Sequence, residues 1–294
     1  MEVLTETARM KEWSRACREG GENVGLVPTM GYLHEGHLSL IRHCRSENER
    51  VVVSIFVNPT QFGPNEDLAR YPRDPEADFT KCEALGVDAI FMPDVKEIYR
   101  PGFQTYVMVE EVSRTMCGAA RPGHFRGVAT VVLKLFNIVA PSAAYFGNKD
   151  YQQLQVIRTM VRDLDLDVRI EPCETVREHD GLAMSSRNAY LSPAERKQAL
   201  CLYQALMEAQ RLFANGERQP KQLLQAMSDR IDRERDAVVD YISLVHPETL
   251  RDLEEMNDGA LAALAVKIGR TRLIDNMLLD ARQPSEPCPG QMTQ

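Results

Sequence analysis

The sequence lacks several features that mark membrane, secreted or nucleic-acid-binding proteins. No apolar run among its 294 residues is long enough to cross a bilayer, and the N-terminus is charged rather than signal-like. The seven cysteines are scattered without a C-x-x-C pair, so neither a disulfide framework nor a zinc site is expected. A basic excess is also missing, since the net charge is −8. We therefore expect a cytoplasmic protein that binds neither membranes nor nucleic acid.

What the sequence does contain is an alternation of strand and helix patterns over its first 175 residues. Strands are predicted at 24–27, 51–57, 87–92, 105–109, 143–146 and 168–170, and helices at 1–19, 37–46, 75–85, 128–139 and 151–163. Apolar runs without alternation, such as VVVSIFV at 51–57, are typical of strands covered on both faces. The pattern predicts a doubly wound parallel α/β sheet, in which ligands bind at the carboxyl ends of strands.

After about residue 176 the pattern changes. Helices are predicted at 193–214 and 219–233, followed by strands at 238–245, 264–268 and 272–277. Ser192 and Glu195 have capping-box spacing, and the last two strands are separated like a hairpin. The sequence thus predicts three regions: a nucleotide-binding domain (1–175), a smaller α+β domain (176–282) and a disordered tail (283–294).

The stretch 27–40, VPTMGYLHEGHLSL, predicts a strand, a tight turn and a helix whose first turn carries His34 and His37. A helix N-terminus suits an anion, and imidazoles can donate hydrogen bonds to phosphate or transfer protons near neutral pH. The i, i+3 spacing and the absence of a further ligand argue against a zincin-type zinc site. Two surface histidines are the alternative, and the preceding Pro28-x-x-Gly31 turn favours phosphate binding.

Two further loops follow predicted strands. In FGNKDYQQ, Lys149 can neutralise phosphate charge, Asp150 can accept from ribose hydroxyls, and Gln153 could face the same cleft. Gln61, in VNPTQF, carries an amide that can both donate to and accept from a hydroxy acid. The alternative for each is an exposed turn whose polar side chains are solvated or bond their own backbone.

Two polar loops complete the set of candidates. Ser185, Ser186 and Arg187, preceded by Met184, could grip a polyphosphate as charge builds in a transition state. A basic loop with Arg121, His124 and Arg126 could cap a cleft. Either segment alone is equally typical of an ordinary exposed loop.

Together these segments resemble the pantoate–β-alanine ligase family over about residues 2–280. The matching segments are VPTMGYLHEGHLSLI, VVSIFVNPTQFGPNEDLARYPR, GHFRGVATVVLKLFNIV through YFGNKDYQQLQVIRTMV, DGLAMSSRNAYLS and IGRTRLIDN. The resemblance implies a Rossmann-like fold of the nucleotidyltransferase superfamily, a C-terminal domain that closes over the cleft, and a homodimer. It also implies attack of pantoate on ATP to give pantoyl adenylate and pyrophosphate, then attack of β-alanine to give pantothenate and AMP.

The resemblance also implies roles for individual residues. The catalytic residues are expected to be His34, His37, Lys149 and Arg187, with His37 as the proton donor. ATP contacts are expected at Met30, Gly31, Tyr32, Leu33, His34, Glu35, Gly36, His37, Gly147, Asn148, Lys149, Asp150, Val176, Met184, Ser185, Ser186 and Arg187. Gln61 and Gln153 are expected to bind pantoate, with Gln61 also near β-alanine. The MSSR loop is similar to the KMSKS loop of class I aminoacyl-tRNA synthetases.

Magnesium is expected to arrive with ATP, and no tightly bound organic cofactor is expected. Some family members have adjacent acidic residues near the magnesium, but Ala77 interrupts the acids of DPEAD here, at 74–78. No protein metal ligand is therefore assigned, because magnesium can be held by phosphates and water. A nucleotidylyltransferase that leaves the nucleotide on its product, and a non-catalytic ATP-binding protein, are the competing hypotheses.

Overall fold

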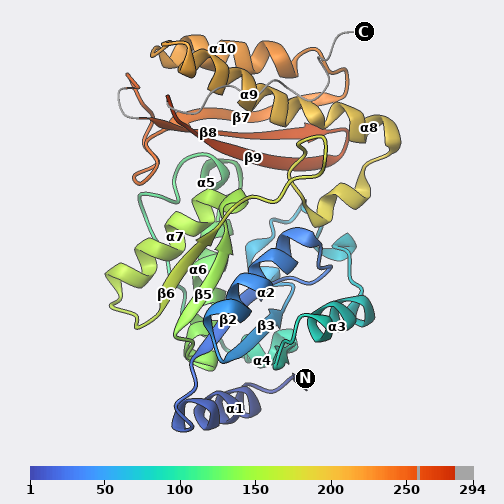
Figure 1. The fold of residues 1–294 in the computed structure, drawn as a ribbon, viewed down its shortest axis with the longest axis vertical. Coiled ribbons are helices and arrows are strands. Elements are labelled where there is room, and N and C mark those ends of the chain that lie inside the picture. The colour runs from blue at the N-terminus through green and yellow to red at the C-terminus, as the bar shows by residue number, and fades with distance from the viewer. Residues whose placement is uncertain (257–258, 282–294) are drawn as a thin grey trace. The chain divides into compact units, whose positions relative to one another are not determined.

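The computed structural model describes residues 1–256 and 259–281, which form two compact units (Figure 1). The first unit consists of Met1–Ser113 and Arg121–Val176, and the second of Arg114–Ala120 and the described residues from Arg177 onward. The predicted disordered tail, 283–294, lies outside the described residues.

The sequence pattern placed residues 114–120 in the first domain, whereas the structure places them in the second unit. Specific contacts account for the difference: Thr115 Oγ1 donates to the carbonyl of Leu250 at 3.3 Å, and Cys117 Sγ lies 3.4 Å from the Tyr241 hydroxyl. Leu250 and Tyr241 are distant from residues 114–120 in the sequence, so local patterns could not indicate that this segment belongs to the second unit.

The first unit is built on a six-stranded parallel sheet with strand order β1-β4-β3-β2-β5-β6. The strands are β1 (Glu2–Leu4), β2 (Val24–Thr29), β3 (Arg50–Ile55), β4 (Ala89–Phe91), β5 (Ala143–Gly147) and β6 (Arg169–Cys173). From β2 the chain runs outward through β3 and β4, then returns to pair β5 on the other side of β2. The predicted doubly wound α/β sheet is thus confirmed, and its switch point lies between β2 and β5.

Helices pack on this sheet, which explains why its central strands have apolar residues without alternation. The helices are α1 (Thr7–Glu19), α2 (Glu35–Glu47), α3 (Pro75–Ala84), α4 (Val95–Ile98), α6 (His124–Val139) and α7 (Tyr151–Asp163). Helix α2 contacts β2, β3 and β5, while α6 contacts β2 and packs between α1 and α7 (Figure 1). Leu26 and Val52 have no exposed surface, as expected for strands between two helical layers.

One predicted strand, 105–109, is wrong, because this segment has no regular secondary structure. Its contacts are made with side chains instead of with a neighbouring strand. The N–H of Val107 donates to Thr130 Oγ1 at 3.0 Å, and the Tyr106 ring lies 4.5 Å from the guanidinium of Arg126. Both partners belong to α6, so the segment runs along a helix without a strand to pair with.

Some predicted boundaries also differ. Strand β1 lies inside the predicted helix 1–19, where three residues at a sheet edge are too few to show periodicity. Helix α6 begins at His124 rather than Val128, after Gly123 with φ +85°. The predicted helix 193–214 is interrupted at Ala199, which separates α8 (Pro193–Gln198) from α9 (Leu200–Ala214).

The second unit contains the antiparallel sheet β7-β8-β9, with α9 and α10 (Pro220–Ile231) packed on it. The strands are β7 (Ala237–Val245), β8 (Ala260–Ile268) and β9 (Thr271–Leu279), and a short helix, α5 (Cys117–Ala120), belongs to the same unit. The predicted hairpin turns at Gly269, with φ +56°. The predicted capping box is present, since Ser192 and Glu195 bond each other's backbone N–H. These features confirm the predicted α+β part.

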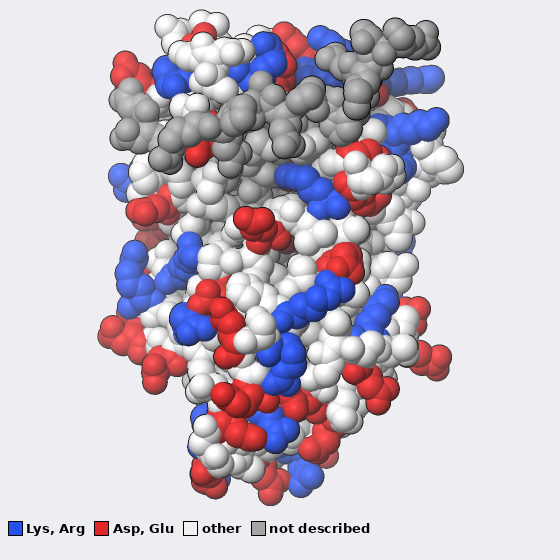
Figure 2. Space-filling model, viewed as in Figure 1, with Lys and Arg blue, Asp and Glu red and all other residues white. Residues whose placement is uncertain are grey.

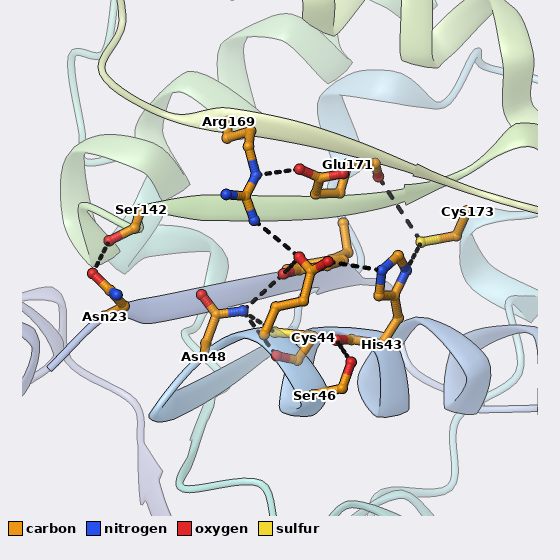
Figure 3. A network of polar contacts seen from close by, with 11 residues as sticks. Asn23, His43, Cys44, Ser46, Asn48, Ser142, Arg169, Glu171 and Cys173 are labelled. Atoms are coloured by element: carbon orange, nitrogen blue, oxygen red, sulfur yellow. Dashed lines mark hydrogen bonds and ion pairs between the residues drawn. The ribbon is translucent and has the colours of Figure 1, made fainter.

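A polar network attaches α2 to β5 and β6 (Figure 3). The hydroxyl of Tyr145, which has no exposed surface, donates to Glu47 at 2.7 Å and accepts from Asn48 Nδ2 at 2.8 Å. Arg169 on β6 donates to the same Glu47 carboxylate at 2.9 Å. The network holds the C-terminal end of α2 on the strands, and so helps to place the turn at its other end.

Candidate functional site at the switch point of the parallel sheet

The candidate site begins with the turn between β2 and α2. Gly31 has φ +80° and Tyr32 has φ +53°, so two consecutive residues adopt left-handed conformations. A Cβ atom on residue 31 would lie 3.0 Å from both Asp78 Oδ2 and Ile55 Cγ2. The requirement for glycine in this turn therefore has two causes, the positive φ and the close packing.

The turn is held by two side chains of α3. The carboxylate of Asp78, only 2% exposed, accepts from the N–H groups of Tyr32 at 2.8 Å and Leu33 at 2.7 Å. Lys81 Nζ donates to the Leu33 carbonyl at 2.7 Å. Burial raises the pKa of Asp78, while the two N–H groups and Lys81 act in the opposite direction. No sequence motif indicated these two residues, because they lie 45 to 48 positions from the turn.

His34 and His37 lie together at the start of α2, as the spacing predicted. Their ring centroids are 4.1 Å apart, and His34 is the N-cap residue. The N–H of His34 donates to His37 Nδ1 at 3.3 Å. When His37 is neutral its proton must therefore be on Nε2, leaving that nitrogen as a hydrogen-bond donor.

The surroundings of His37 favour the neutral imidazole. Desolvation lowers its pKa well below 6.5, and the positive charges of His34, Lys149 and Lys81 act in the same direction. In the unliganded protein at neutral pH, His37 is thus a neutral Nε2–H donor. Lys149, which takes part in this effect, follows β5, the strand that pairs with β2.

The loop after β5 contains the predicted Gly147–Asp150 segment. Gly147 ends the strand, and Asn148–Asp150 form a 3-10 turn that leads directly into α7. Lys149 Nζ lies 3.9 Å from Asp150 Oδ2, and the lysine side chain is largely buried at 18% exposure. Gln153 lies in the first turn of α7 and is partly buried. Strand neighbours β2 and β5 thus present a histidine pair and a lysine on the two sides of the switch point.

Gln61 lies after β3, in the 3-10 turn Pro59–Gln61, and is mostly buried. Its Nε2 is 3.4 Å from Met30 Sδ, so the structure brings Gln61 to the turn after β2. Asn58 Nδ2 donates to Gln61 Oε1 at 3.0 Å and to the carbonyl of Gly127 at 3.1 Å. Asn58 Oδ1 accepts from Thr60 and from the hydroxyl of Tyr99.

These contacts determine which way the amide of Gln61 points. Because the Gly127 carbonyl can only accept and the Thr60 N–H can only donate, Asn58 must present its NH₂ to Gln61 Oε1. The NH₂ of Gln61 is then directed toward Met30 as a donor. Asn58 caps the 3-10 turn and directly precedes Pro59. An asparagine before a proline is a turn signal, so the sequence could have indicated Asn58 as a structural residue of this loop. Nothing local to the sequence indicated Tyr99.

The basic loop of 121–126 contacts the backbone of Gln61. His124 Nδ1 donates to the Gln61 carbonyl at 2.8 Å, and His124 Nε2 accepts from Arg121 at 3.0 Å. Desolvation, aided by the charge of Arg121, lowers the pKa of His124 to about 4. Arg121 is also paired with Glu66 at 2.6 Å. The loop therefore supports the Gln61 turn, except for Arg126, which stacks on Tyr106 instead.

Gly127 explains how α6 approaches this turn so closely. A Cβ atom at this position would lie 2.5 Å from the Thr60 carbonyl oxygen and 2.7 Å from the Gln61 nitrogen. Only glycine permits this approach, so the glycine contributes to placing Gln61 through backbone packing.

The other residues predicted to contact ATP belong partly to the first unit and partly to the second. Val176 is the last residue of the first unit, whereas Met184, Ser185, Ser186 and Arg187 belong to the second. Ser185 caps the 3-10 helix Ser186–Tyr190 by accepting from the N–H of Arg187 at 3.3 Å. The segment leading to this loop is anchored by Arg177, which donates to the Gly181 carbonyl at 3.0 Å and pairs with Asp275 at 2.6 Å.

The described residues contain no group of three or more His, Cys, Asp or Glu side chains that could hold a metal ion. The two carboxylate oxygens of Asp78 accept from backbone N–H groups, and Asp74 caps α3 by accepting from Ala77. Because these carboxylates are occupied by backbone N–H groups, the residues present fit a magnesium ion held by substrate phosphates better than one held by protein ligands.

On the face shown in Figure 2, acidic and basic side chains of the described residues are interspersed, without a continuous basic stripe. Within residues 1–256 and 259–281, no helix has the length and apolar character needed to cross a bilayer.

A doubly wound sheet with a histidine pair and a lysine in the turns on the two sides of its switch point is typical of a nucleotide-binding α/β enzyme. The sequence profile described as pantoate-beta-alanine ligase matches residues 2–278, and the chain belongs to this family. This confirms the resemblance inferred from the motifs.

Similar proteins cover nearly the whole chain. It is 54% identical over 280 residues to a pantothenate synthetase of Acetivibrio thermocellus, which covers 95% of this chain and 100% of the relative. A pantothenate synthetase of a Roseiflexus species is 56% identical over 281 residues, covering 96% and 100%.

Solved structures of pantothenate synthetases are also similar to this chain. A pantothenate synthetase from Thermus thermophilus has a TM-score of 0.90 at 48% identity, covering 94% of this chain and 99% of the other. A pantoate-beta-alanine ligase from Francisella tularensis, complexed with "Beta-gamma ATP" and β-alanine, has a TM-score of 0.79 at 36% identity, covering 95% and 97%.

Proposed function

We propose that this chain joins pantoate to β-alanine with ATP, through a pantoyl-adenylate intermediate. A pantoate carboxylate oxygen attacks the α-phosphorus, and the bond to the β-phosphate oxygen breaks to release pyrophosphate. The β-alanine amine then attacks the acyl carbon and loses a proton, while the bond to the AMP oxygen breaks. The observation that supports this best is the switch point itself, where His34 and His37 lie together at the start of α2 and the charge of Lys149, which follows β5, acts on His37.

In the first step, the protein positions reactants and stabilises charge without a nucleophile of its own. His37 donates a hydrogen bond from Nε2 to a phosphate oxygen, and Lys149 offsets the charge that develops on the leaving pyrophosphate. Phosphate charge around His37 would raise its lowered pKa, which lets it hold a proton in the transition state. The N–H groups of Tyr32 and Leu33 already donate to Asp78, so the expected ATP contacts at these residues must come from other atoms.

Pantoate recognition follows from the orientation of Gln61. Its NH₂ group donates to a pantoate oxygen beside Met30, while Gln153 contributes a second amide. Magnesium enters as part of the Mg–ATP substrate and is held by phosphates and water. Asp150 binds the ribose, and no tightly bound organic cofactor takes part.

We propose further contacts and properties for the same reaction. Gly147, Asn148 and Val176 contact ATP, as do Met30, Gly31, Glu35, Gly36 and the loop Met184–Arg187, in which Arg187 binds phosphate. The protein acts as a cytoplasmic homodimer without nucleic-acid or membrane partners.

A coupled assay with each substrate omitted in turn tests the function. AMP should be released only when ATP, pantoate and β-alanine are all present, while pyrophosphate should be released with ATP and pantoate alone. A stable nucleotide adduct that accumulates despite β-alanine would indicate a nucleotidylyltransferase and overturn the proposal. ATP binding without turnover of any combination would indicate a non-catalytic protein.

A further inference from the structure

We propose that Asp78 and Lys81 are positioning residues that set the shape of the phosphate-binding turn and, through it, the tautomer of His37. This inference rests on the proposed function, since the turn matters only if the first step takes place there. Neither residue was among the candidates from the sequence, and neither is assigned to substrate.

Three successive peptide groups of the turn are held by side chains of α3. The Gly31–Tyr32 and Tyr32–Leu33 peptides donate their N–H groups to Asp78 Oδ2 and Oδ1, at 2.8 and 2.7 Å. The third peptide, Leu33–His34, presents its carbonyl to Lys81 Nζ at 2.7 Å. One carboxylate and one ammonium group, a single helical turn apart on α3, therefore fix three consecutive peptide planes.

The third peptide links the contacts of Asp78 and Lys81 to the imidazole of His37. Its carbonyl accepts from Lys81, and its N–H, which belongs to His34, donates to His37 Nδ1 at 3.3 Å. Since a peptide is planar, fixing the carbonyl also fixes the direction of the N–H. Lys81 thus holds the donor that keeps the proton of neutral His37 on Nε2.

The backbone of the turn needs this support. Gly31 and Tyr32 both have positive φ, which is unfavourable for the tyrosine and persists only where surrounding contacts enforce it. Asp78 is almost fully buried, so water does not compete for its two N–H donors. A positioning role for Asp78 is also distinct from a metal-ligand role, because its oxygens already accept from the backbone.

The test separates the two steps of the reaction in Asp78→Asn and Lys81→Met. We expect pyrophosphate release from ATP and pantoate to slow by about 10–100-fold in Asp78→Asn, since small misplacement of reacting groups has effects of this size. The reaction of β-alanine with preformed pantoyl adenylate should change by less than about 3-fold. The magnesium concentration for half-maximal rate should stay unchanged, whereas a metal ligand would shift it.

Asp74→Ala is the matched control, since Asp74 caps the same helix without contacting the turn. It should destabilise α3 yet leave the balance between the two steps unchanged. Equal slowing of both steps in Asp78→Asn, a wild-type first step, or a shifted magnesium dependence would each overturn the proposal.

A readout independent of activity is the imidazole ¹⁵N spectrum of the unliganded protein. His37 should be the Nε2–H tautomer in the wild type, and Lys81→Met should populate the Nδ1–H form. An unchanged spectrum in that variant contradicts the inference, even if Asp78→Asn fails to fold. A wild-type protein that never releases pyrophosphate would instead reject the proposed function, with the tautomer result still deciding the role of Lys81.

Discussion

The backbone N–H of His34 donates to Nδ1 of His37 at 3.3 Å, which assigns the proton of the neutral imidazole to Nε2. The H-x-x-H spacing therefore does more than place two rings at a helix N-terminus. The first histidine, through its backbone, determines which nitrogen of the second can face an anion. The two histidines are thus not equivalent, and this asymmetry leads to the first prediction.

His37→Ala should lower turnover by about 10²–10⁴-fold, the usual range for a group that takes part in proton transfer. The loss should be in pyrophosphate release from ATP and pantoate, measured in a single turnover. His43→Ala is the matched control, because His43 lies on the same helix and contacts Glu47 and Cys173 instead of the turn. A near-normal first step in His37→Ala would remove this residue from the mechanism.

The buried His124 should make folding stability depend on pH. Its folded pKa of about 4 lies below the ordinary value of 6.5, so its contribution is complete above pH 6.5 and is lost as the pH falls toward 4. The shift corresponds to at most about 3 kcal/mol. His124→Gln should be less stable at pH 7 but lose less of its unfolding free energy between pH 7 and 4.5, measured by urea denaturation.

The control for this prediction is His179→Gln, which removes an exposed imidazole. The unfolding free energy of this variant should depend on pH as in the wild type. An equal slope in His124→Gln and wild type would show that the protonation of His124 does not contribute to acid destabilisation.

Tyr99→Phe should weaken the use of pantoate without affecting ATP. The hydroxyl of Tyr99 donates to Asn58 Oδ1 at 2.9 Å, and Asn58 orients the amide of Gln61. Loss of one such hydrogen bond typically changes a free energy by about 0.5–1.5 kcal/mol, or roughly 2–12-fold in KM for pantoate. Tyr106→Phe, at an exposed tyrosine nearby, should leave both KM values unchanged. A rise in the KM for ATP alone would contradict this reading of the network.

Arg177→Met should destabilise the second unit by about 3–5 kcal/mol, because it leaves the carboxylate of Asp275 buried without its partner. Replacing Asp275 by Asn in the same variant should recover much of the loss, as a double-mutant cycle in urea would measure. Arg211→Met removes an exposed pair with Glu208 and should cost less than about 1 kcal/mol. Additive losses at residues 177 and 275 would show that the pair is not coupled.

The parts of the fold that the sequence predicted are those with strong local patterns. Helix α7 has the predicted bounds, Tyr151–Asp163, because its apolar residues repeat with helical spacing between a polar turn and a polar end. The segment 105–109 had an equally plausible strand pattern, yet it pairs with side chains of α6. A pattern shows which residues avoid water, but it does not show whether a partner strand is present.

The distinction between local sequence patterns and tertiary contacts also applies to the candidate site. Sequence alone determined the α/β class, the H-x-x-H turn, the lysine-bearing turn after β5 and the family, because each depends on residues close together in the chain. Tertiary structure decided that Asp78 and Lys81 brace the turn and that Tyr99 holds the side chain of Asn58, which orients Gln61. These hydrogen bonds depend on distances of about 3 Å between atoms, many of them far apart in sequence. Only the packing of α3 and of the end of α4 against the sheet brings such groups together.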